Sequence, residues 1–336
     1  MNPLSLARRL KLDPYILAIL CMVGLASLLP ARGIATEGLG YLTKIAIGCL
    51  FFLHGARLPR ETVLGGLRNW RLHVVVLAFT FLMFPIIGFG ITHLPTVVLP
   101  AVFSSGMLFL TCLPSTVQSS IAFTSIARGN IAGAIVSASA SNLIGIFITP
   151  LLVSFLMGQS GAEVSLEAAG RIVMQLLLPF IAGQIARLWM AEWAARQKKM
   201  LGLFDRGTIL LVVYSAFSEA VVGGIWHTIN VADFGRLLLV CVVFLAAVLT
   251  VTTLAARWLG FAKADEIAIV FCGSKKSLAS GVPMAGILFP GAAVGVVILP
   301  LMLFHQVQLM ACAMLAQRYA TRSKDDPARA NTEVVV

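Results

Sequence analysis

The sequence predicts an all-α polytopic membrane protein with ten transmembrane helices, arranged as two inverted five-helix repeats. Composition is the first observation behind this prediction, because 59% of the 336 residues are hydrophobic, only 12% are charged and the mean hydropathy is +0.95. Soluble domains carry about twice that share of charged residues. The spacing of the apolar segments and the placement of the basic residues are the other two observations, and they set the number and orientation of the helices.

A helix needs roughly 20 apolar residues to cross a bilayer. The chain has ten segments of about this kind, at residues 14–30, 39–57, 72–93, 97–126, 131–157, 168–188, 207–226, 234–257, 266–289 and 293–317. The first segment follows Arg8, Arg9 and Lys11 and has the look of a signal peptide. We keep it as a helix, because its removal would spoil both the helix count and the internal repeat.

The basic residues follow this topology. With the N-terminus in the cytoplasm, the outer segments keep only Arg32, Arg171 and Arg236 of the 25 basic residues, and most of the others fall in inner segments. This is the positive-inside pattern, and it explains the net charge of +11 without a nucleic-acid partner. We therefore expect a multi-pass protein of a bacterial-type inner membrane with both termini cytoplasmic and the lipid bilayer as its surroundings.

Five helices followed by five more have opposite orientations in the membrane, which is the inverted-repeat arrangement. The segment CLPSTVQSS at residues 112–120 resembles CGSKKSLAS at residues 272–280. Each is a polar interruption between two apolar halves. The predicted units are residues 1–160 and 161–320, followed by a disordered cytoplasmic tail at 321–336. Residues 187–206 are expected to form a cytoplasmic loop between the halves, against anionic headgroups.

Two adjacent lysines, Lys275 and Lys276, lie inside the apolar ninth span, in FCGSKKSLASGVPM. A lysine at the bilayer centre costs roughly 2.5 to 3.5 kcal/mol, so such residues face protein or a water-filled cavity. Neighbouring residues on a helix lie about 100° apart, so both lysines can face one cavity only if the backbone is unwound there. Glycine and proline around them favour a broken helix. We expect Ser274, Lys275, Lys276 and Ser277 to belong to a substrate or ion site, with snorkelling to an interface as the alternative.

Spans four and five carry polar residues of the same kind. Around Pro114, which frees a backbone carbonyl, lie Ser115, Thr116, Gln118, Ser119 and Ser120, and span five adds Ser137, Ser141 and Asn142. Such oxygen clusters bind alkali cations or polar groups of substrates. Sodium binding at Gln118, Ser119, Ser120 and Asn142 is one hypothesis. The alternative is that these side chains only bond neighbouring helices or their own carbonyls.

Two further residues are candidates for ion coupling. Glu219 is an acid inside span seven, and its alternative place is the water-exposed outer end of that span. His305 lies beside Gln306 and Gln308 in span ten and is able to titrate near neutral pH. The six cysteines lie singly in apolar runs, which indicates packing residues, and no cofactor other than a coupling sodium ion is expected.

The segments LPSTVQSSIAFTSIARGN, SNLIGIFITPLL, FCGSKKSLASGVPM and LMLFHQVQL resemble the bile acid:sodium symporter superfamily, specifically its SBF-like branch. The resemblance extends over nearly the whole chain. It implies a panel domain and a core domain, with broken helices four and nine crossing near mid-membrane. It also implies alternating access, with an organic anion held between the domains.

The resemblance also implies where sodium would bind in that family: an asparagine and hydroxyls of span four, hydroxyls of span five, and a glutamate and glutamine of span nine. This chain departs from the pattern, because residues 271–284 contain no acid and hold the two lysines instead. The functional roles that the resemblance implies therefore apply only to Gln118, Ser119 and Ser120 in span four and to residues 274–277 in span nine.

A lysine ammonium can occupy the place of a bound cation, and it would repel sodium a few ångströms away by several kcal/mol. Two hypotheses follow. Either sodium binds a reshaped site made of oxygens from spans four and five, or a lysine acts as a built-in cation. In the second case protons are the coupling ion, carried by Glu219, His305 or a lysine.

The function predicted from the sequence is a secondary active transporter that moves a small anionic organic solute by alternating access, as a monomer or homodimer. The alternative is a membrane regulatory or scaffold protein that keeps the fold without transport. An enzyme is not expected, because the chain contains no HExxH or GxSxG motif and no paired intramembrane aspartates. The pair of broken helices argues against a channel.

Overall fold

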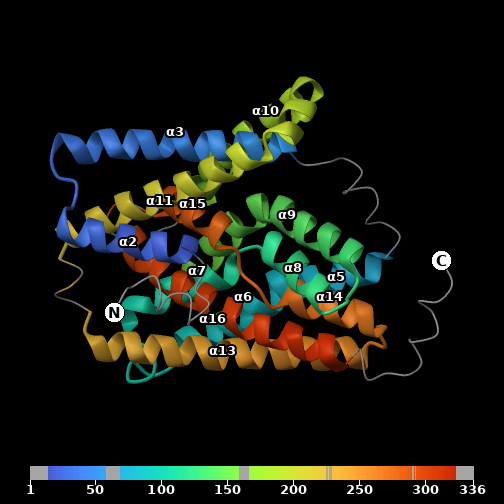
Figure 1. Cartoon of the computed structure of the whole chain (residues 1–336). Coiled ribbons are helices and arrows are strands. Elements are labelled where there is room, and N and C mark those ends of the chain that lie inside the picture. Colours follow the sequence, from blue (N-terminus) through green and yellow to red (C-terminus); the bar gives the residue numbers. More distant parts are fainter. Residues whose placement is uncertain are drawn as a thin grey trace, which may run out of the picture.

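The computed structural model describes residues 14–57, 69–158, 166–224, 226, 229–289, 291 and 293–322, and these residues are helical with short connections and no strand. Figure 1 shows the helices lying side by side in layers. The predicted boundary between the two units, at residues 160 and 161, lies outside the described residues. Of the tail predicted at residues 321–336, residues 321 and 322 are the end of a helix, and the rest also lies outside the described residues.

The helices follow the predicted spans closely. They are α2 (Pro14–Leu28), α3 (Ile34–Arg57), α5 (Trp70–Ala78), the π-helix η2 (Phe79–Met83), α6 (Phe84–Thr92), the 3-10 helix η3 (Ala101–Phe103), α7 (Ser104–Cys112), α8 (Gln118–Ile126), α9 (Ile131–Gly158), α10 (Leu166–Arg196), α11 (Lys198–Val222), α13 (Val231–Trp258), α14 (Lys263–Gly273), α15 (Leu278–Leu288) and α16 (Ala293–Arg322).

Six helices within the described residues are long and apolar enough to cross a membrane. They are Ile34–Arg57, Trp70–Thr92, Ile131–Met157, Lys198–Val222, Val231–Trp258 and Ala293–Thr321. Shorter apolar helices lie at Leu17–Leu28 and Ala101–Cys112, inside the first and fourth predicted spans. The all-helical membrane fold is therefore confirmed, whereas the ten-span inverted topology stays a prediction.

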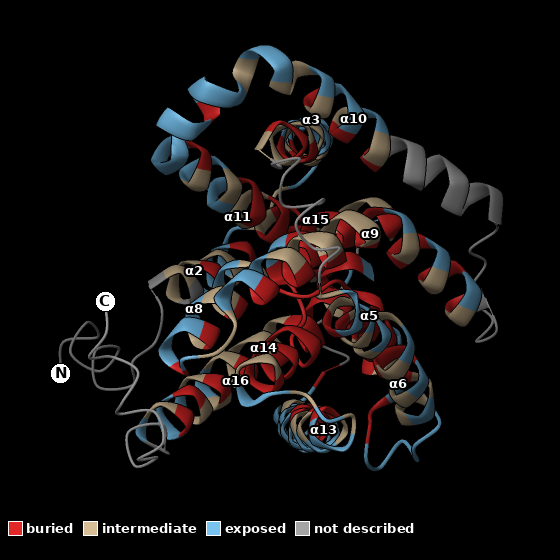
Figure 2. Ribbon diagram, turned by 90° about the vertical axis from the view of Figure 1, so that its right-hand side faces the viewer, coloured by how far each residue is buried: buried red, intermediate tan, exposed pale blue. Residues whose placement is uncertain are grey.

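The helices pack as two groups that share one long boundary. In the first group α10 packs along α3, and α11 packs on both α2 and α3. The second group contains α5 to α9 and α13 to α16, with α7, α14 and α15 as its most buried elements and α13 on its outer side (Figure 2). The boundary is formed by α10 against α9, and by α11 against α15 and α16.

Two glycines allow α3 and α10 to touch backbone to backbone. A Cβ atom added at Gly55 would overlap the carbonyl oxygen of Phe180, and one added at Gly183 would overlap that of Phe52. The side chain of Gln184 also donates a hydrogen bond of 2.7 Å to the Gly55 carbonyl. Small residues at such a crossing are the usual way that membrane helices come into close van der Waals contact.

Two helices are broken where the sequence predicted it. Between α7 and α8 the backbone leaves the helix at residues 113–117, because Pro114 has no N–H to donate to the preceding turn. Between α14 and α15 it leaves the helix at residues 274–277, which include both lysines. The backbone at Lys275 and Lys276 is therefore unwound.

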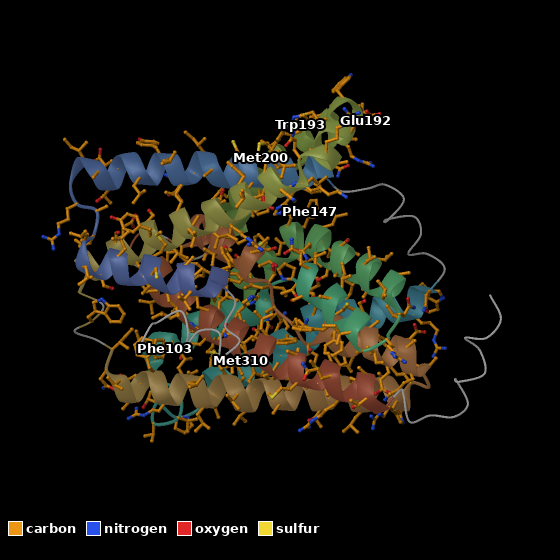
Figure 3. The ribbon with its side chains drawn as sticks, in the orientation of Figure 1. Phe103, Phe147, Glu192, Trp193, Met200 and Met310 are labelled. Carbon is orange, nitrogen blue, oxygen red and sulfur yellow. The ribbon has the colours of Figure 1, made fainter. Side chains whose placement is uncertain are left out.

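The loop predicted at residues 187–206 is not a loop. Helix α10 continues to Arg196 and α11 begins at Lys198, so Gln197 alone separates them. The prediction read the loss of hydropathy as the loss of a helix. Hydropathy decides whether a helix enters a membrane, whereas the alanines, leucines and lysines of this stretch are strong helix formers. Glu192 and Trp193 lie near the end of α10, at the edge of the molecule (Figure 3).

Candidate functional site

The two helix breaks contact each other in the middle of the second helix group. The backbone N–H of Ser277 donates to the carbonyl of Pro114 at 2.9 Å. In the other direction, the Ser115 hydroxyl donates to the carbonyl of Cys272 and the Ser120 hydroxyl donates to that of Phe271 at 2.9 Å. Each break thus satisfies backbone groups that the other leaves without a helical partner.

Lys276 places its ammonium group between three backbone carbonyls. Its Nζ donates to the oxygens of Thr80, Thr111 and Leu113, each at 2.7 Å. The same nitrogen lies 4.1 Å from the ring centroid of Phe84, and the residue is 0% exposed. The three N–H donors of an ammonium match three carbonyls, and the ring face adds a cation–π contact.

Local departures from regular helix explain why two of these carbonyls are available. Ahead of Pro85 the helix changes to the wider π form, and Phe84 donates its N–H to Phe79 instead of Thr80. In the same π pattern the Thr80 carbonyl would accept from the N–H of residue 85. That residue is Pro85, which has no N–H, so the Thr80 carbonyl is left to Lys276. At the end of α7, the N–H of Ser115 turns to the Ser141 hydroxyl at 3.0 Å and leaves the Thr111 carbonyl free for the same lysine.

The backbone of Lys276 is held by α16. The amide of Gln308 accepts from the Lys276 N–H at 3.0 Å and donates to its carbonyl at 2.9 Å. The ring of His305 lies 2.8 Å from the nitrogen of that amide. The same ring has its Nδ1 3.4 Å from the Lys276 carbonyl, so His305 contacts the lysine backbone both directly and through Gln308, a residue that the sequence analysis named only as a neighbour. Three polar residues within an apolar span were the signal that identified this face of α16.

Lys275 has different surroundings. It is also 0% exposed, but its Nζ makes one long contact of 3.5 Å with the Ser119 hydroxyl. The same nitrogen lies 4.1 Å from the ring centroid of Phe123 and 5.5 Å from that of Phe271. The unwound backbone therefore turns the two lysines into different pockets, one lined by carbonyls and one by aromatic rings. Both ammonium groups are enclosed by protein and do not reach an interface.

Asn142 connects span five to both breaks. Its amide nitrogen donates to the carbonyl of Ser115 at 2.7 Å and to that of Ala138 at 3.0 Å, and its oxygen accepts from the Ser280 hydroxyl at 2.7 Å. The Ser277 hydroxyl caps α15 by accepting from the Ser280 N–H at 3.1 Å. One asparagine thus holds the first break, its own helix and α15 together.

The other candidate site residues from the sequence analysis lie in several different environments. Thr116, Ser119 and Ser120 form a hydroxyl chain with contacts of 2.8 and 3.0 Å, and Ser274 bonds back to Val270. Ser137 is buried and lies 2.7 Å from a ring nitrogen of His73. Gln118 is exposed. Of the four residues considered for sodium, Ser119 and Ser120 lie in the hydroxyl chain and Asn142 lies in the Ser115 and Ser280 cluster.

Glu219 lines a cavity elsewhere, between α3, α11, α15 and α16, together with Lys44. Lys44 is a residue that the sequence analysis did not single out. Its signal was visible, because it is a lysine inside the apolar segment 39–57, four residues from the middle residue, 48.

Replacing Asn142 by alanine is expected to lower the stability of the purified protein by roughly 2 kcal/mol, because buried carbonyl and hydroxyl groups lose their partner. The measurement is the melting temperature in detergent. Ser139→Ala, on the same helix but outside this cluster of hydrogen bonds, is the matched control and should melt as the parent does. Equal melting of Asn142→Ala and the parent would show that the asparagine does not hold the breaks together.

Comparisons with known proteins agree on the family. The model of the SBF-like CPA transporter family matches residues 13–321. A protein of Pseudomonas aeruginosa is 53% identical over 323 residues, covering 96% of each chain. "Putative symporter YfeH" of Escherichia coli is 51% identical over 313 residues, covering 93% of this chain and 94% of its own.

A more distant relative is "Sodium/bile acid cotransporter 7-A" of Xenopus laevis, which is 28% identical over 321 residues, covering 93% of each chain. The resemblance seen in the motifs of spans four and nine is therefore confirmed along nearly the whole chain. A transporter family also agrees with the expectation of a transporter rather than an enzyme. The chain belongs to the SBF-like CPA transporter family.

Proposed function

We propose that this protein is a secondary active transporter that moves a small organic solute with an anionic group across a bacterial inner membrane. The observation that carries the proposal is the contact between two broken helices around a buried pair of lysines. Broken helices that meet inside the membrane are typical of secondary transporters, and relatives named as symporters agree with this class. Lys275, whose ammonium makes only one long hydrogen-bond contact, favours an anionic group on the solute.

Alternating access would come from motion of the two helix groups against each other. Their boundary consists of α10 against α9 and of α11 against α15 and α16, and a cavity opens within it. The contact between the two helix breaks lies wholly inside the second group, so both breaks would move together with that group. The proposal includes the ten-helix topology, with inverted repeats and cytoplasmic termini.

The proposed coupling ion is the proton. The three carbonyls around Lys276 are hard oxygen ligands of the kind that bind sodium, but a tethered ammonium already occupies them at 2.7 Å. A second cation a few ångströms away would be repelled by several kcal/mol. In this proposal Lys276 is a permanent structural cation, and Glu219 and His305 are the candidate proton carriers.

The test uses proteoliposomes that contain a pH-sensitive dye, challenged with a panel of amino acids and organic acids in sodium-free choline buffer. We expect at least one solute to acidify the interior faster than in protein-free liposomes. A response that needs sodium would contradict proton coupling. If no solute changes the dye signal, and the melting curve shows that the protein is folded, the non-transporting scaffold is favoured instead.

A further inference from the structure

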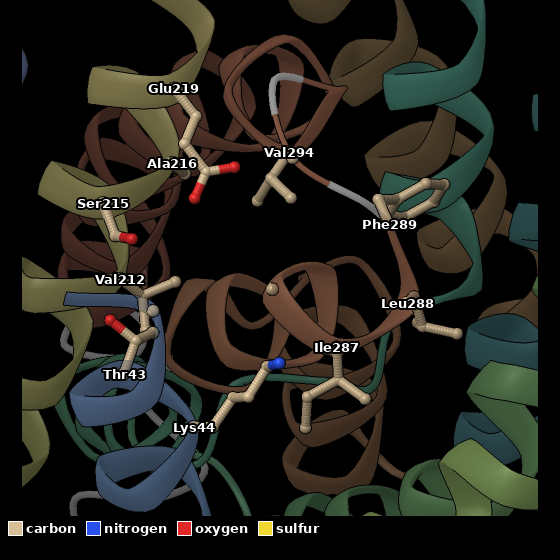
Figure 4. Close-up of a pocket in the computed structure, with 13 residues that line it drawn as sticks. Thr43, Lys44, Val212, Ser215, Ala216, Glu219, Ile287, Leu288, Phe289 and Val294 are labelled. Atoms are coloured by element: carbon tan, nitrogen blue, oxygen red, sulfur yellow. The ribbon is translucent and has the colours of Figure 1, made fainter. Parts of the chain in front are cut away.

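A cavity of about 540 Å³ lies at the boundary between the two helix groups. Its walls come from α3 and α11 on one side, and from α15, residue 291 and the start of α16 on the other (Figure 4). The volume is within the range of pockets that bind small molecules. The cavity is distinct from the lysine crossing, because α15 contributes its last residues here and its first residues there. In the predicted topology this is the outer side of the membrane.

One positive and one negative side chain point into this cavity. Figure 4 shows the ammonium group of Lys44 and the carboxylate of Glu219 reaching into the opening from different helices. Within the described part of the chain, no ion pair or hydrogen bond joins them. Gly291 lies beside the acid, since a Cβ atom built there would be in ordinary van der Waals contact with a Glu219 oxygen, at 3.4 Å. Both charges are therefore available to a molecule in the cavity.

The opposite wall is apolar. It is lined mainly by Ile287, Leu288, Phe289 and Val294, and Figure 4 shows the Val294 side chain pointing into the opening. A neighbouring hollow of about 500 Å³ shares Lys44 and Glu219 and adds the carboxylate of Glu37. The full lining thus combines one ammonium, two carboxylates and an apolar face.

We infer that the cavity is the outward-facing binding site for a zwitterionic solute with an apolar body, of the kind represented by apolar α-amino acids. Its carboxylate would bind Lys44, its ammonium would bind Glu219, and its side chain would lie on the α15 and α16 wall. This inference rests on the proposed function and narrows it, because the transported solute then carries a positive group as well as a negative one. A solute with one charge would leave either Lys44 or Glu219 without a partner in a partly desolvated site, which disfavours it.

The experiment measures the melting temperature of the full chain in detergent with three probes that share the leucine side chain: leucine, N-acetylleucine and leucine amide. These carry both charges, only the negative charge and only the positive charge at neutral pH, and phenylalanine serves as a second zwitterion. A ligand that binds the folded state raises its stability. We expect leucine or phenylalanine to raise the melting temperature by a few degrees at saturation, and the two singly charged probes to have little effect.

Two variants assign the charges. Glu219→Gln should weaken leucine binding about tenfold or more and remove its advantage over N-acetylleucine, whereas Lys44→Met should remove its advantage over leucine amide. Glu192→Gln and Lys199→Met, at exposed sites on α10 and α11, are the matched controls and should leave all three responses unchanged.

The possible outcomes separate the two proposals. Stabilisation by N-acetylleucine alone, or equally by all three probes, would overturn the zwitterion site but keep a transporter of anions. Stabilisation by leucine amide alone would overturn both the zwitterion and the anionic group. Failure of every amino-acid probe to shift the melting temperature would overturn the site, whatever the dye assay of transport shows.

Discussion

The Lys276→Met variant is expected to melt on the order of 10 °C below the parent protein in detergent. The methionine keeps most of the apolar stem but leaves the carbonyls of Thr80, Thr111 and Leu113 without their shared donor. Each unsatisfied buried acceptor costs about 1–3 kcal/mol, and the variant no longer has to desolvate an ammonium, which offsets part of this. A net loss of about 4 kcal/mol corresponds to the stated shift for a domain of this size.

The neighbouring lysine provides the control. Lys275→Met removes an ammonium that is equally buried but makes only one hydrogen-bond contact, at 3.5 Å, besides its two ring contacts. We expect a clearly smaller shift from this variant than from Lys276→Met. If the two variants melt alike, the carbonyl contacts of Lys276 are not what makes it structurally important.

A shortened side chain tests whether Lys276 stands in for a free cation. Lys276→Ala leaves the three carbonyls and the space that the ammonium filled. We expect sodium to raise the melting temperature of this variant by several degrees relative to choline at equal ionic strength, because a cation that binds the folded state stabilises it. The parent protein should show no such difference. A sodium effect in the parent would indicate a separate sodium site and contradict the proposed coupling.

The Gly55→Ala variant is expected to be the other strongly destabilised protein, with a fall in melting temperature of about 5 °C or more. Its Cβ would overlap the backbone of Phe180 on α10, and a backbone cannot rotate away as a side chain can. The helices α3 and α10 must then separate and lose contacts along their length, at a cost of about 1–3 kcal/mol or more for such overpacking.

The matched control lies two turns earlier on the same helix. A Cβ atom at Gly48 meets nothing within 4 Å. Because alanine favours a helix over glycine by roughly 1 kcal/mol, Gly48→Ala should leave the melting temperature unchanged or raise it. A fall in melting temperature for Gly55→Ala, together with no change or a rise for Gly48→Ala, would establish the close α3–α10 contact. A loss at both positions would mean that the helix tolerates no added methyl group, and the contact would not be the cause.

The sequence by itself was enough to predict the helices, their apolar character and the two breaks. These features depend on local chemistry: apolar length decides whether a helix suits a bilayer, and Pro114 removes a donor wherever the chain goes. The motifs around Pro114 and Lys276 were also enough to identify the family. The error at residues 187–206 was local as well, since low hydropathy was interpreted as the absence of a helix.

Only the tertiary structure decided how the two lysines differ. Lys275 and Lys276 are neighbours of the same type, and nothing in the sequence distinguishes them. Their surroundings come from residues such as Thr80, Thr111 and Ser119, which are more than 150 positions away along the chain. The same holds for Lys44 and Glu219, which come from α3 and α11 and meet at one cavity. Contacts of this kind depend on how the helices pack, because a side chain's partners are set by distance in space and not by spacing in the sequence.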